Sequence, residues 1–170
     1  HVANERNIGL VSMTGGVGTY VDGMRAAHWG SDVHLVPAPL VVKDPTVATA
    51  LSTEPAVTNL LDMALDASYQ LVGIGELSQT STVVRSGYIS PSEIEPLRRK
   101  GAVGDILCRF FDQDGQALNL PFHDRVIGVK LEALARSQKV VAAAGGPGKV
   151  RAIRAALLGK IASILITDED

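Results

Sequence analysis

The sequence has little of what marks a secreted, membrane-spanning or nucleic-acid-binding chain. Its single cysteine, Cys108, cannot form an internal disulfide, and the apolar residues around it predict a buried thiol in a reducing compartment. Every apolar run is interrupted by glycine, proline or charge well before the roughly 20 residues needed to span a bilayer. The formal net charge of −2 gives no electrostatic reason for this segment to hold a nucleic-acid backbone by itself. These absences predict a cytoplasmic chain with no membrane partner.

Aromatic residues are also scarce, at 4%, although hydrophobic residues make up 46% of the sequence. The core must therefore consist mainly of valine, leucine, isoleucine and alanine, the mixture favoured by buried parallel strands with helices packed against them. At 170 residues the chain is long enough for one domain with a core of its own. The composition favours an α/β domain.

Strand-like and helix-like patterns alternate along the sequence. Short apolar runs predict strands at residues 7–13, 32–36, 69–74, 103–111, 116–120, 126–129, 139–144 and 161–167. Helical patterns lie at 20–29, from Pro55 to Leu65, from a capping box at Ser90 to Lys100, at 131–137 and at 148–158, with a short helix inside a loop at 40–54. An Asp-Gly turn at 112–115 predicts that the strands on either side of it pair antiparallel.

Strands separated by helices in this way predict an α/β fold with a mostly parallel, Rossmann-like sheet and helices on both faces. Ligands of such sheets bind outside the carboxyl ends of the strands. Three glycine-rich turns are predicted at that edge, namely Thr14-Gly15-Gly16-Val17-Gly18, Gly73-Ile74-Gly75-Glu76 and Gly145-Gly146-Pro147-Gly148-Lys149. Each turn alone is as readily explained as a tight connection between a strand and a helix. Three of them at one edge favour a site for a small anion, because glycine lets backbone N–H groups approach it closely.

Charged residues beside these turns are the candidates for ligand contacts. Lys149 precedes a predicted helix, and its ammonium could hold a phosphate or a carboxylate, although many lysines are merely solvated. Asp105 and Glu76 are the carboxylates nearest the predicted cleft and could accept hydrogen bonds from sugar hydroxyls. A role in a turn or a helix cap is the alternative for each of them.

The sequence lacks the motifs of several other classes of site. Ala143 and Val150 stand where a phosphate-binding loop of the NTPase type requires glycine and a hydroxyl residue, and Val21 stands where the dinucleotide fingerprint requires its third glycine. The histidines lack the spacing of a metal site, and there is no Gly-x-Ser-x-Gly elbow. We therefore predict no metal, no cofactor and no catalytic residue.

Taken together, the motifs resemble the SorC/DeoR-like sugar-binding regulators of bacteria. The resemblance covers almost the whole chain and rests on segments at 14–18, 35–40, 72–75, 101–106, 111–115, 125–128, 144–149 and 165–169, in this order. It implies that residues 1–170 are the effector-binding domain of a transcriptional regulator, with a fold similar to the sugar-phosphate isomerase and CoA-transferase group. It also implies a fragment of a longer protein, a homo-oligomer (dimer or tetramer), and contact with operator DNA only through an N-terminal helix-turn-helix domain absent from this chain.

The resemblance and the turns together predict a phosphorylated sugar or polyol as the effector. The residues predicted to bind it are Thr14, Gly15, Gly16, Val17, Gly18, Gly73, Ile74, Gly75, Glu76, Gly104, Asp105 and Lys149. Some family members carry a basic residue where Thr14 stands, so this chain is predicted to take a monophosphate or an unphosphorylated polyol rather than a bisphosphate. One alternative is a sugar-phosphate isomerase or deaminase with Asp105 or Glu76 as general base. Another is an oligomerisation module that binds no ligand.

Overall fold

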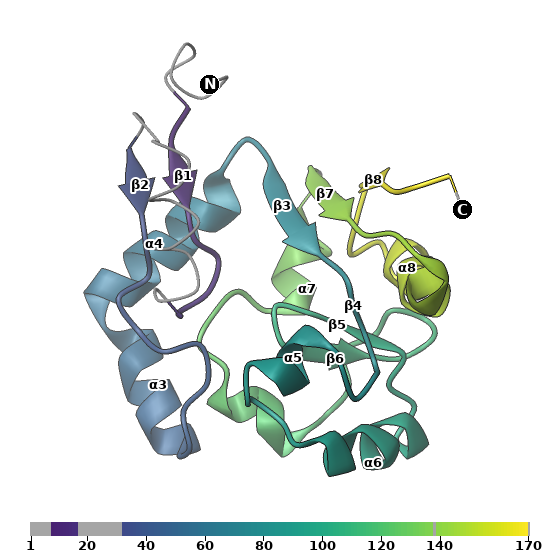
Figure 1. The fold of residues 1–170 in the computed structure, drawn as a ribbon. Helices are drawn as coiled ribbons and strands as arrows, with labels where there is room; N and C mark the ends of the chain where they lie inside the picture. The colour runs from purple at the N-terminus through teal and green to yellow at the C-terminus, as the bar shows by residue number, and fades with distance from the viewer. Residues whose placement is uncertain (1–7, 17–31, 138, 170) are drawn as a thin grey trace. The chain divides into compact units, whose positions relative to one another are not determined.

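A computed structural model describes residues 8–16, 32–137 and 139–169 of the chain (Figure 1). The chain forms two compact units. The first unit comprises His1–Ala67 and Asp124–Val129, and the second comprises Ser68–His123 and Lys130–Asp170. No helix in the described part of the chain is both long enough and apolar enough to cross a membrane.

The first unit is built on two short parallel strands, β1 (Leu10–Val11) and β2 (Val33–His34). Two helices follow them, α3 (Pro45–Thr53) and α4 (Pro55–Asp66), and each begins with a proline, which needs no hydrogen-bond acceptor in the first turn. The helices contribute Ala48 and Val57 to a small core that also contains Val36, Ala38 and Ile127. The segment that carries Ile127 therefore returns late in the sequence to complete the first unit.

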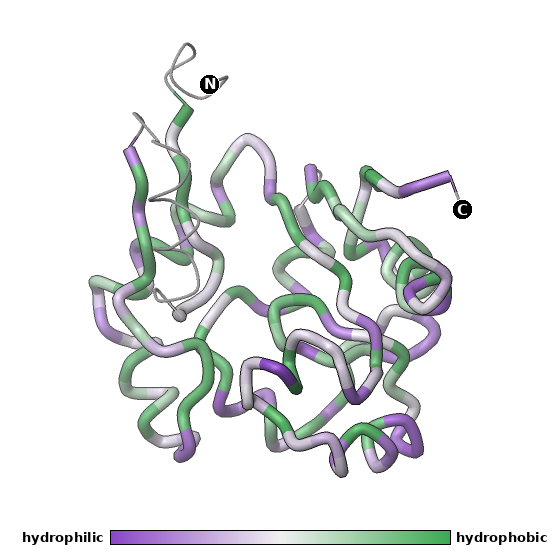
Figure 2. The backbone as a smooth tube through the Cα atoms, viewed as in Figure 1, coloured by the Kyte–Doolittle hydropathy of each residue, from purple (hydrophilic) through white to green (hydrophobic). Residues whose placement is uncertain are grey.

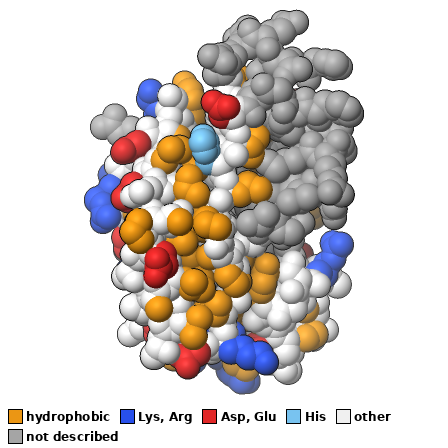
Figure 3. Space-filling view, turned by 90° about the vertical axis from the view of Figure 1, so that its left-hand side faces the viewer, with side chains coloured by type: hydrophobic (Ala, Val, Ile, Leu, Met, Phe, Trp, Pro, Cys, Tyr) orange, Lys and Arg blue, Asp and Glu red, His pale blue; other side chains and the backbone are white. Residues whose placement is uncertain are grey.

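The outer face of the first unit is partly apolar. Figure 3 shows hydrophobic side chains spread over the face that carries α3 and α4. In this unit Val47 on α3 and Met63 on α4 are exposed, with 46% and 44% of their surface accessible. Both lie on helices whose opposite side faces the core.

The second unit contains a parallel sheet of three strands in the order β3 (Gln70–Gly73), β7 (Val140–Ala143) and β8 (Ile164–Ile166). Alternate residues of β3 and β7 are buried, as expected for strands with one covered face. The nine-residue helix α8 (Val150–Leu158) connects β7 to β8 and buries its small residues Ala152, Ala155 and Ala156. Figure 2 shows hydrophobic residues along β3 and β7. The predicted parallel α/β architecture is confirmed.

A second, antiparallel sheet in the same unit has the order β4 (Gly75–Glu76), β5 (Gly104–Ile106) and β6 (Arg109–Phe111). Residues 103–111 were predicted to form one strand, and this is wrong. Leu107 and Cys108 form a two-residue turn with φ of 53° and 60°, and the chain folds back there. Left-handed backbone is unusual for residues other than glycine and asparagine, so no residue type marked this turn.

Several other predicted elements differ from the structure. Residues 116–120 and 126–129 make only isolated bridges, from Ala117 to Phe111, from Val126 to Val41 and from Gly128 to Thr14. Gly75 and Glu76 were predicted to lie in a turn but form β4.

The second unit also contains short helices. They are α5 (Thr82–Arg85), α6 (Ile94–Arg99) and α7 (Leu131–Leu134). Three short 3-10 helices are η1 (Pro91–Glu93), η2 (Pro121–Arg125) and η3 (Pro147–Lys149). The helix predicted at 20–29 lies outside the described residues.

The capping box at Ser90 is confirmed. The backbone N–H of Ser90 donates to Glu93 Oε2 at 2.7 Å, and η1 leads directly into α6. Gly159 is the C-cap of α8, and the left-handed residue that follows it is Lys160, with φ of 56°. A Cβ at Gly159 would lie 2.7 Å from the Cα of Gly115, so close packing of two chain segments requires glycine here.

Candidate functional site

The candidate site begins where β4 pairs with β5. Gly75 lies opposite Asp105, and Glu76 lies opposite Gly104. A glycine therefore stands across the ladder from each carboxylate. A Cβ at Gly75 would overlap the Asp105 carboxylate, and a Cβ at Gly148 would overlap the Glu76 carboxylate. The structure thus brings together three of the predicted segments, 73–76, 104–105 and 145–149, within the second unit.

Asp105 is a buried carboxylate, with 7% of its surface accessible. Burial raises the pKa of Asp105 to about 6, while a hydrogen bond from the Cys108 backbone N–H and the charge of Lys149 act in the opposite direction. The turn at Leu107 and Cys108 therefore aims a backbone donor at this carboxylate. Burial and the negative charge of Asp105 raise the pKa of the Cys108 thiol to about 12. Cys108 is free and buried, as predicted.

Glu76 is half-buried and is held from two sides. Ser78 Oγ donates to Glu76 Oε1 at 2.9 Å, and the other carboxylate oxygen packs against Gly148. Successive residues of a strand point to opposite faces, and directly paired residues share a face. The Glu76 side chain therefore lies on the face of the ladder that meets Gly148 of η3, and the Asp105 side chain lies on the other face. Sequence reasoning missed Ser78, because a serine two residues beyond a glutamate has no distinctive signature.

The Gly145–Lys149 turn, residues 145–149, lies at the carboxyl end of β7. Gly146 has φ of 90°, and its carbonyl accepts the N–H of Lys149 at 3.0 Å to close η3. The carboxylate of Asp168 packs against Gly145, since a Cβ there would lie 2.6 Å from it. Asp168 was also missed, although the rule that parallel strands end at one edge could have found it, because it follows β8.

Lys149 supplies the positive charge of the site. Its side chain is half-buried, and its positive charge acts to lower the pKa of Asp105. Among the described residues no carboxylate lies within ion-pair distance of the Lys149 ammonium. The ammonium therefore retains hydrogen-bond donors for a ligand.

The first glycine turn is placed differently. Thr14 is buried, the N–H of Gly15 donates to the Ile127 carbonyl at 3.1 Å, and the N–H of Gly16 donates to the Ala38 carbonyl at 2.8 Å. These amides hold the first unit together. Val17 and Gly18 lie outside the described residues, so a contribution of this turn to ligand binding stays a prediction.

Two other predicted residues have mainly packing roles. Ile74 is 1% exposed and belongs to the core, between β3 and β4. Gly104 packs against α8, since a Cβ there would lie 2.5 Å from the Cβ of Ala152. Gly73 is exposed at the end of β3 and has open space around it. In the described part of the chain no group of three His, Cys, Asp or Glu side chains could hold a metal ion.

The curated proteins similar to this chain include transcriptional regulators. The transcriptional regulator LsrR of Klebsiella pneumoniae is 41% identical over 167 residues, which are 96% of this chain and 52% of that protein. LsrR of Escherichia coli K12 is 41% identical over 170 residues, which are 98% of this chain and 54% of that protein. The chain thus spans about half the length of the curated relatives it matches. Their names are those of regulators, in agreement with the prediction that this chain is not an enzyme.

Comparison with solved structures gives the same result. A DeoR family transcriptional regulator from Listeria monocytogenes has a TM-score of 0.85 at 29% identity, covering 94% of this chain and 66% of that one. The sugar-binding domain of a transcriptional repressor from Vibrio fischeri has a TM-score of 0.82 at 32% identity, covering 95% and 66%. Full-length SorC from Klebsiella pneumoniae, at 19% identity, shares the fold with a TM-score of 0.80.

The predicted resemblance is confirmed at the level of the family. A family model described as "Putative sugar-binding domain" matches residues 1–170, which is the whole chain. The chain therefore belongs to the family of sugar-binding domains found in SorC/DeoR-type transcriptional regulators.

Proposed function

We propose that the chain is the effector-binding domain of a bacterial transcriptional regulator and that its effector is a phosphorylated sugar or polyol. The effector binds where the β4–β5 ladder meets η3, beside Glu76 on one face of the ladder, Asp105 on the other face and Lys149. Its binding changes the affinity of the intact protein for operator DNA. A ligand produces such a change only if it binds one state of the protein more tightly than the other.

The observation that carries this proposal is the arrangement of charge in the second unit. A buried carboxylate, Asp105, lies within electrostatic reach of a lysine that has no ion-pair partner among the described residues. Asp105 can accept hydrogen bonds from hydroxyls, and the Lys149 ammonium can donate to a phosphate. The two groups together suit a ligand that carries both hydroxyls and an anion.

We infer the number of phosphates from the resemblance to the family, in which some members carry a basic residue where Thr14 stands. A bisphosphate would need a second cationic group, and the first glycine turn offers Thr14, which is buried and carries no charge. The N–H groups of Gly15 and Gly16 already donate to backbone carbonyls. We therefore favour a monophosphate or a neutral polyol over a bisphosphate.

The regulator as a whole is proposed from its relatives. The chain spans about half the length of the LsrR regulators, and we infer that operator DNA is bound by a helix-turn-helix domain outside these 170 residues. We also infer a cytoplasmic homo-oligomer, a dimer or a tetramer, because symmetric oligomers match the two-fold symmetry common in operators.

Ligand binding tests the proposal directly. The melting temperature of the intact protein is measured with a panel of pentose and hexose monophosphates and the corresponding free sugars and polyols. A ligand that binds only the native state raises the melting temperature. We expect at least one monophosphate or polyol to do so, and Lys149→Met to weaken its binding at least about tenfold, since hydrogen bonds to charged groups contribute about 1.5 to 3 kcal/mol.

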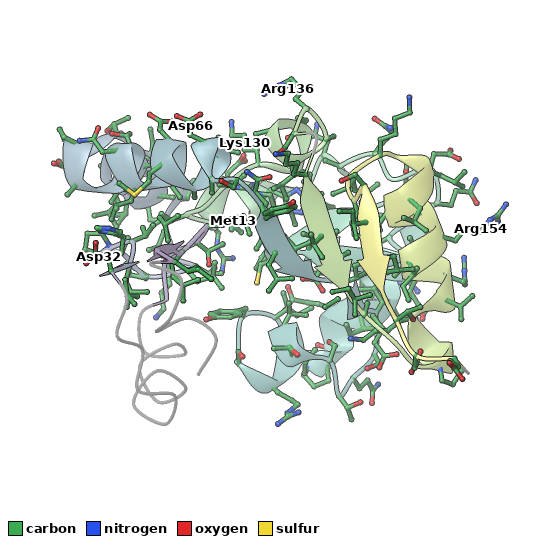
Figure 4. The ribbon with its side chains drawn as sticks, turned by 90° about the horizontal axis from the view of Figure 1, so that it is seen from above. Met13, Asp32, Asp66, Lys130, Arg136 and Arg154 are labelled. Atoms are coloured by element: carbon green, nitrogen blue, oxygen red, sulfur yellow. The ribbon has the colours of Figure 1, made fainter. Side chains whose placement is uncertain are left out.

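Lys130→Met is the matched control, because Lys130 is an exposed lysine at the start of α7 (Figure 4). This variant should bind like the wild type. The proposal is wrong if no sugar phosphate or polyol shifts the melting temperature, or if both lysine variants lose affinity equally.

A further inference from the structure

A pocket lies in the second unit, apart from the Glu76, Asp105 and Lys149 cluster. Its volume is about 420 Å³, which is within the usual range for small-molecule sites. The end of α6, the turn that follows β6 and the first turn of α8 form its walls. None of the residues predicted from the sequence to bind a ligand lines it.

One side of this pocket is basic. Arg98 and Lys100 reach it from the end of α6, and Arg151 reaches it from α8. Arg98 already has two partners, because its guanidinium donates to the Leu77 carbonyl and lies 3.7 Å from the carboxylate of Glu95. Within the described residues Lys100 and Arg151 have no carboxylate partner. Figure 2 shows the end of α6 as a strongly hydrophilic segment.

Helix electrostatics explain the α6 cations but not Arg151. Cations near the C-terminus of a helix are stabilised by its dipole, which accounts for Arg98 and Lys100. Arg151 is the second residue of α8, where the dipole opposes a positive charge. An anion bound between Lys100 and Arg151 would offset this unfavourable position.

The opposite side of the pocket carries acceptors on a rigid turn. Asp112 Oδ1 accepts the N–H groups of Asp114 at 3.0 Å and of Gln116 at 2.9 Å. Gly115, with φ of 74°, packs so closely against α8 that a Cβ would overlap the Ala155 carbonyl. The turn is therefore fixed to α8, and the exposed residue Asp114 lines the pocket beside it.

We propose that this pocket is a second binding site for a small phosphomonoester that carries hydroxyl groups. Its phosphate lies between Lys100 and Arg151, and its hydroxyls donate to the carboxylate of Asp114. The charges suit such a ligand better than a plain polyanion, because a polyanion would be repelled by Asp112 and Asp114. This site does not depend on the function proposed for the Lys149 cluster.

The test separates the two sites by stoichiometry. Ribose 5-phosphate and, separately, inorganic phosphate are titrated calorimetrically into the intact protein carrying Lys149→Met. We expect one phosphomonoester site per chain to remain. Adding Lys100→Ala and Arg151→Ala should weaken that site at least about tenfold, because each removes a charged hydrogen-bond donor. Ribose 5-phosphate should bind more tightly than inorganic phosphate, since only the sugar reaches Asp114.

Arg99→Ala with Arg154→Ala is the matched control. Both arginines are exposed, they lie on the same two helices, and neither lines this pocket; Arg154 points away from α8 in Figure 4. This control should bind like the Lys149→Met parent. The proposal is overturned if Lys149→Met already abolishes all binding, or if the control pair lowers the affinity as much as the pocket pair. All the substituted side chains are exposed or half-buried, so the fold is retained and either result is interpretable.

Discussion

Gly15 in the first unit and Gly75 in the second were predicted to have the same role, and the structure gives them different ones. The space where a side chain of Gly15 would lie is filled by the backbone carbonyls of Ala38 and Pro39. The corresponding space at Gly75 is filled by the carboxylate of Asp105. One glycine permits two backbone segments to meet, whereas the other makes room for a charged group.

The difference extends to the hydrogen bonds of the two turns. The N–H groups of Gly15 and Gly16 donate to carbonyls of the same unit, so these two hydrogen bonds stabilise the first unit. In the second unit Gly75, Gly145 and Gly148 lie against carboxylates, and the Lys149 ammonium has no ion-pair partner among the described residues. A glycine-rich turn in a sequence therefore indicates close approach, but only the neighbour that approaches reveals whether the purpose is packing or binding.

The largest effect expected from this comparison is that of Gly15→Ala on stability. The new Cβ would overlap carbonyl oxygens of the backbone, which cannot rotate away as a side chain can. We expect the free energy of unfolding to fall by about 3 kcal/mol, the upper range for overpacking a rigid site. Urea denaturation followed by circular dichroism measures the change.

Gly73→Ala is the control for this prediction. Gly73 has nothing within 4 Å of the position where its Cβ would lie, and it does not require positive φ. Its unfolding free energy should change by less than about 0.5 kcal/mol. Equal losses in the two variants would remove the distinction between the two kinds of glycine.

An intermediate effect is expected at Asp105, where the second unit buries a charge. Because the pKa of Asp105 is raised to about 6 in the folded protein, the folded state binds a proton more tightly than the unfolded state. Stability should therefore fall as the pH rises from about 4 to about 6 and remain constant above that range. Asp105→Asn should remove this slope and be more stable above pH 6, on the order of 2 kcal/mol.

Asp105→Asn should also bind the effector less tightly, since it exchanges a charged acceptor for a neutral amide. Denaturation curves at several pH values, with Asp114→Asn as an exposed control, separate this group from the other carboxylates. A wild-type stability that does not change between pH 4 and pH 6 would contradict the assignment of a buried, destabilising charge to Asp105.

Much of the fold was predictable from the sequence, because its main elements have strong local signals. Pro55 and the apolar spacing after it located α4, and the capping box at Ser90 located the start of η1 and α6. The hairpin between β5 and β6 was not predictable, since Leu107 and Cys108 adopt left-handed backbone without glycine or asparagine. Residues 116–120, which were predicted to form a strand, make one bridge, from Ala117 to Phe111.

The candidate site was predictable to a similar degree. Parallel strands end at one edge, which correctly brought the segment around Gly75 together with the one around Lys149. Asp105 was predicted as a candidate ligand-binding residue. Its burial depends on the pairing of β5 with β4, whose residues Gly75 and Glu76 were predicted to form a turn. Ser78 and Asp168 acquire their roles only through side-chain geometry, which local patterns do not contain.

The smallest effects are expected when the hydroxyl group of Ser12 in the first unit or of Ser78 in the second unit is removed. These two substitutions also compare the two units most directly. Ser12 Oγ accepts the N–H of the fully buried Val36 at 2.8 Å, whereas Ser78 Oγ donates to Glu76 at 2.9 Å. Ser12→Ala should lower the unfolding free energy by about 1 kcal/mol, because a buried N–H loses its acceptor, and leave effector affinity unchanged. Ser78→Ala should have the converse effect, with little loss of stability and weaker binding through a less ordered Glu76. If Ser12→Ala instead weakens binding at unchanged stability, the first turn belongs to the binding site, and the division of tasks between the two units is wrong.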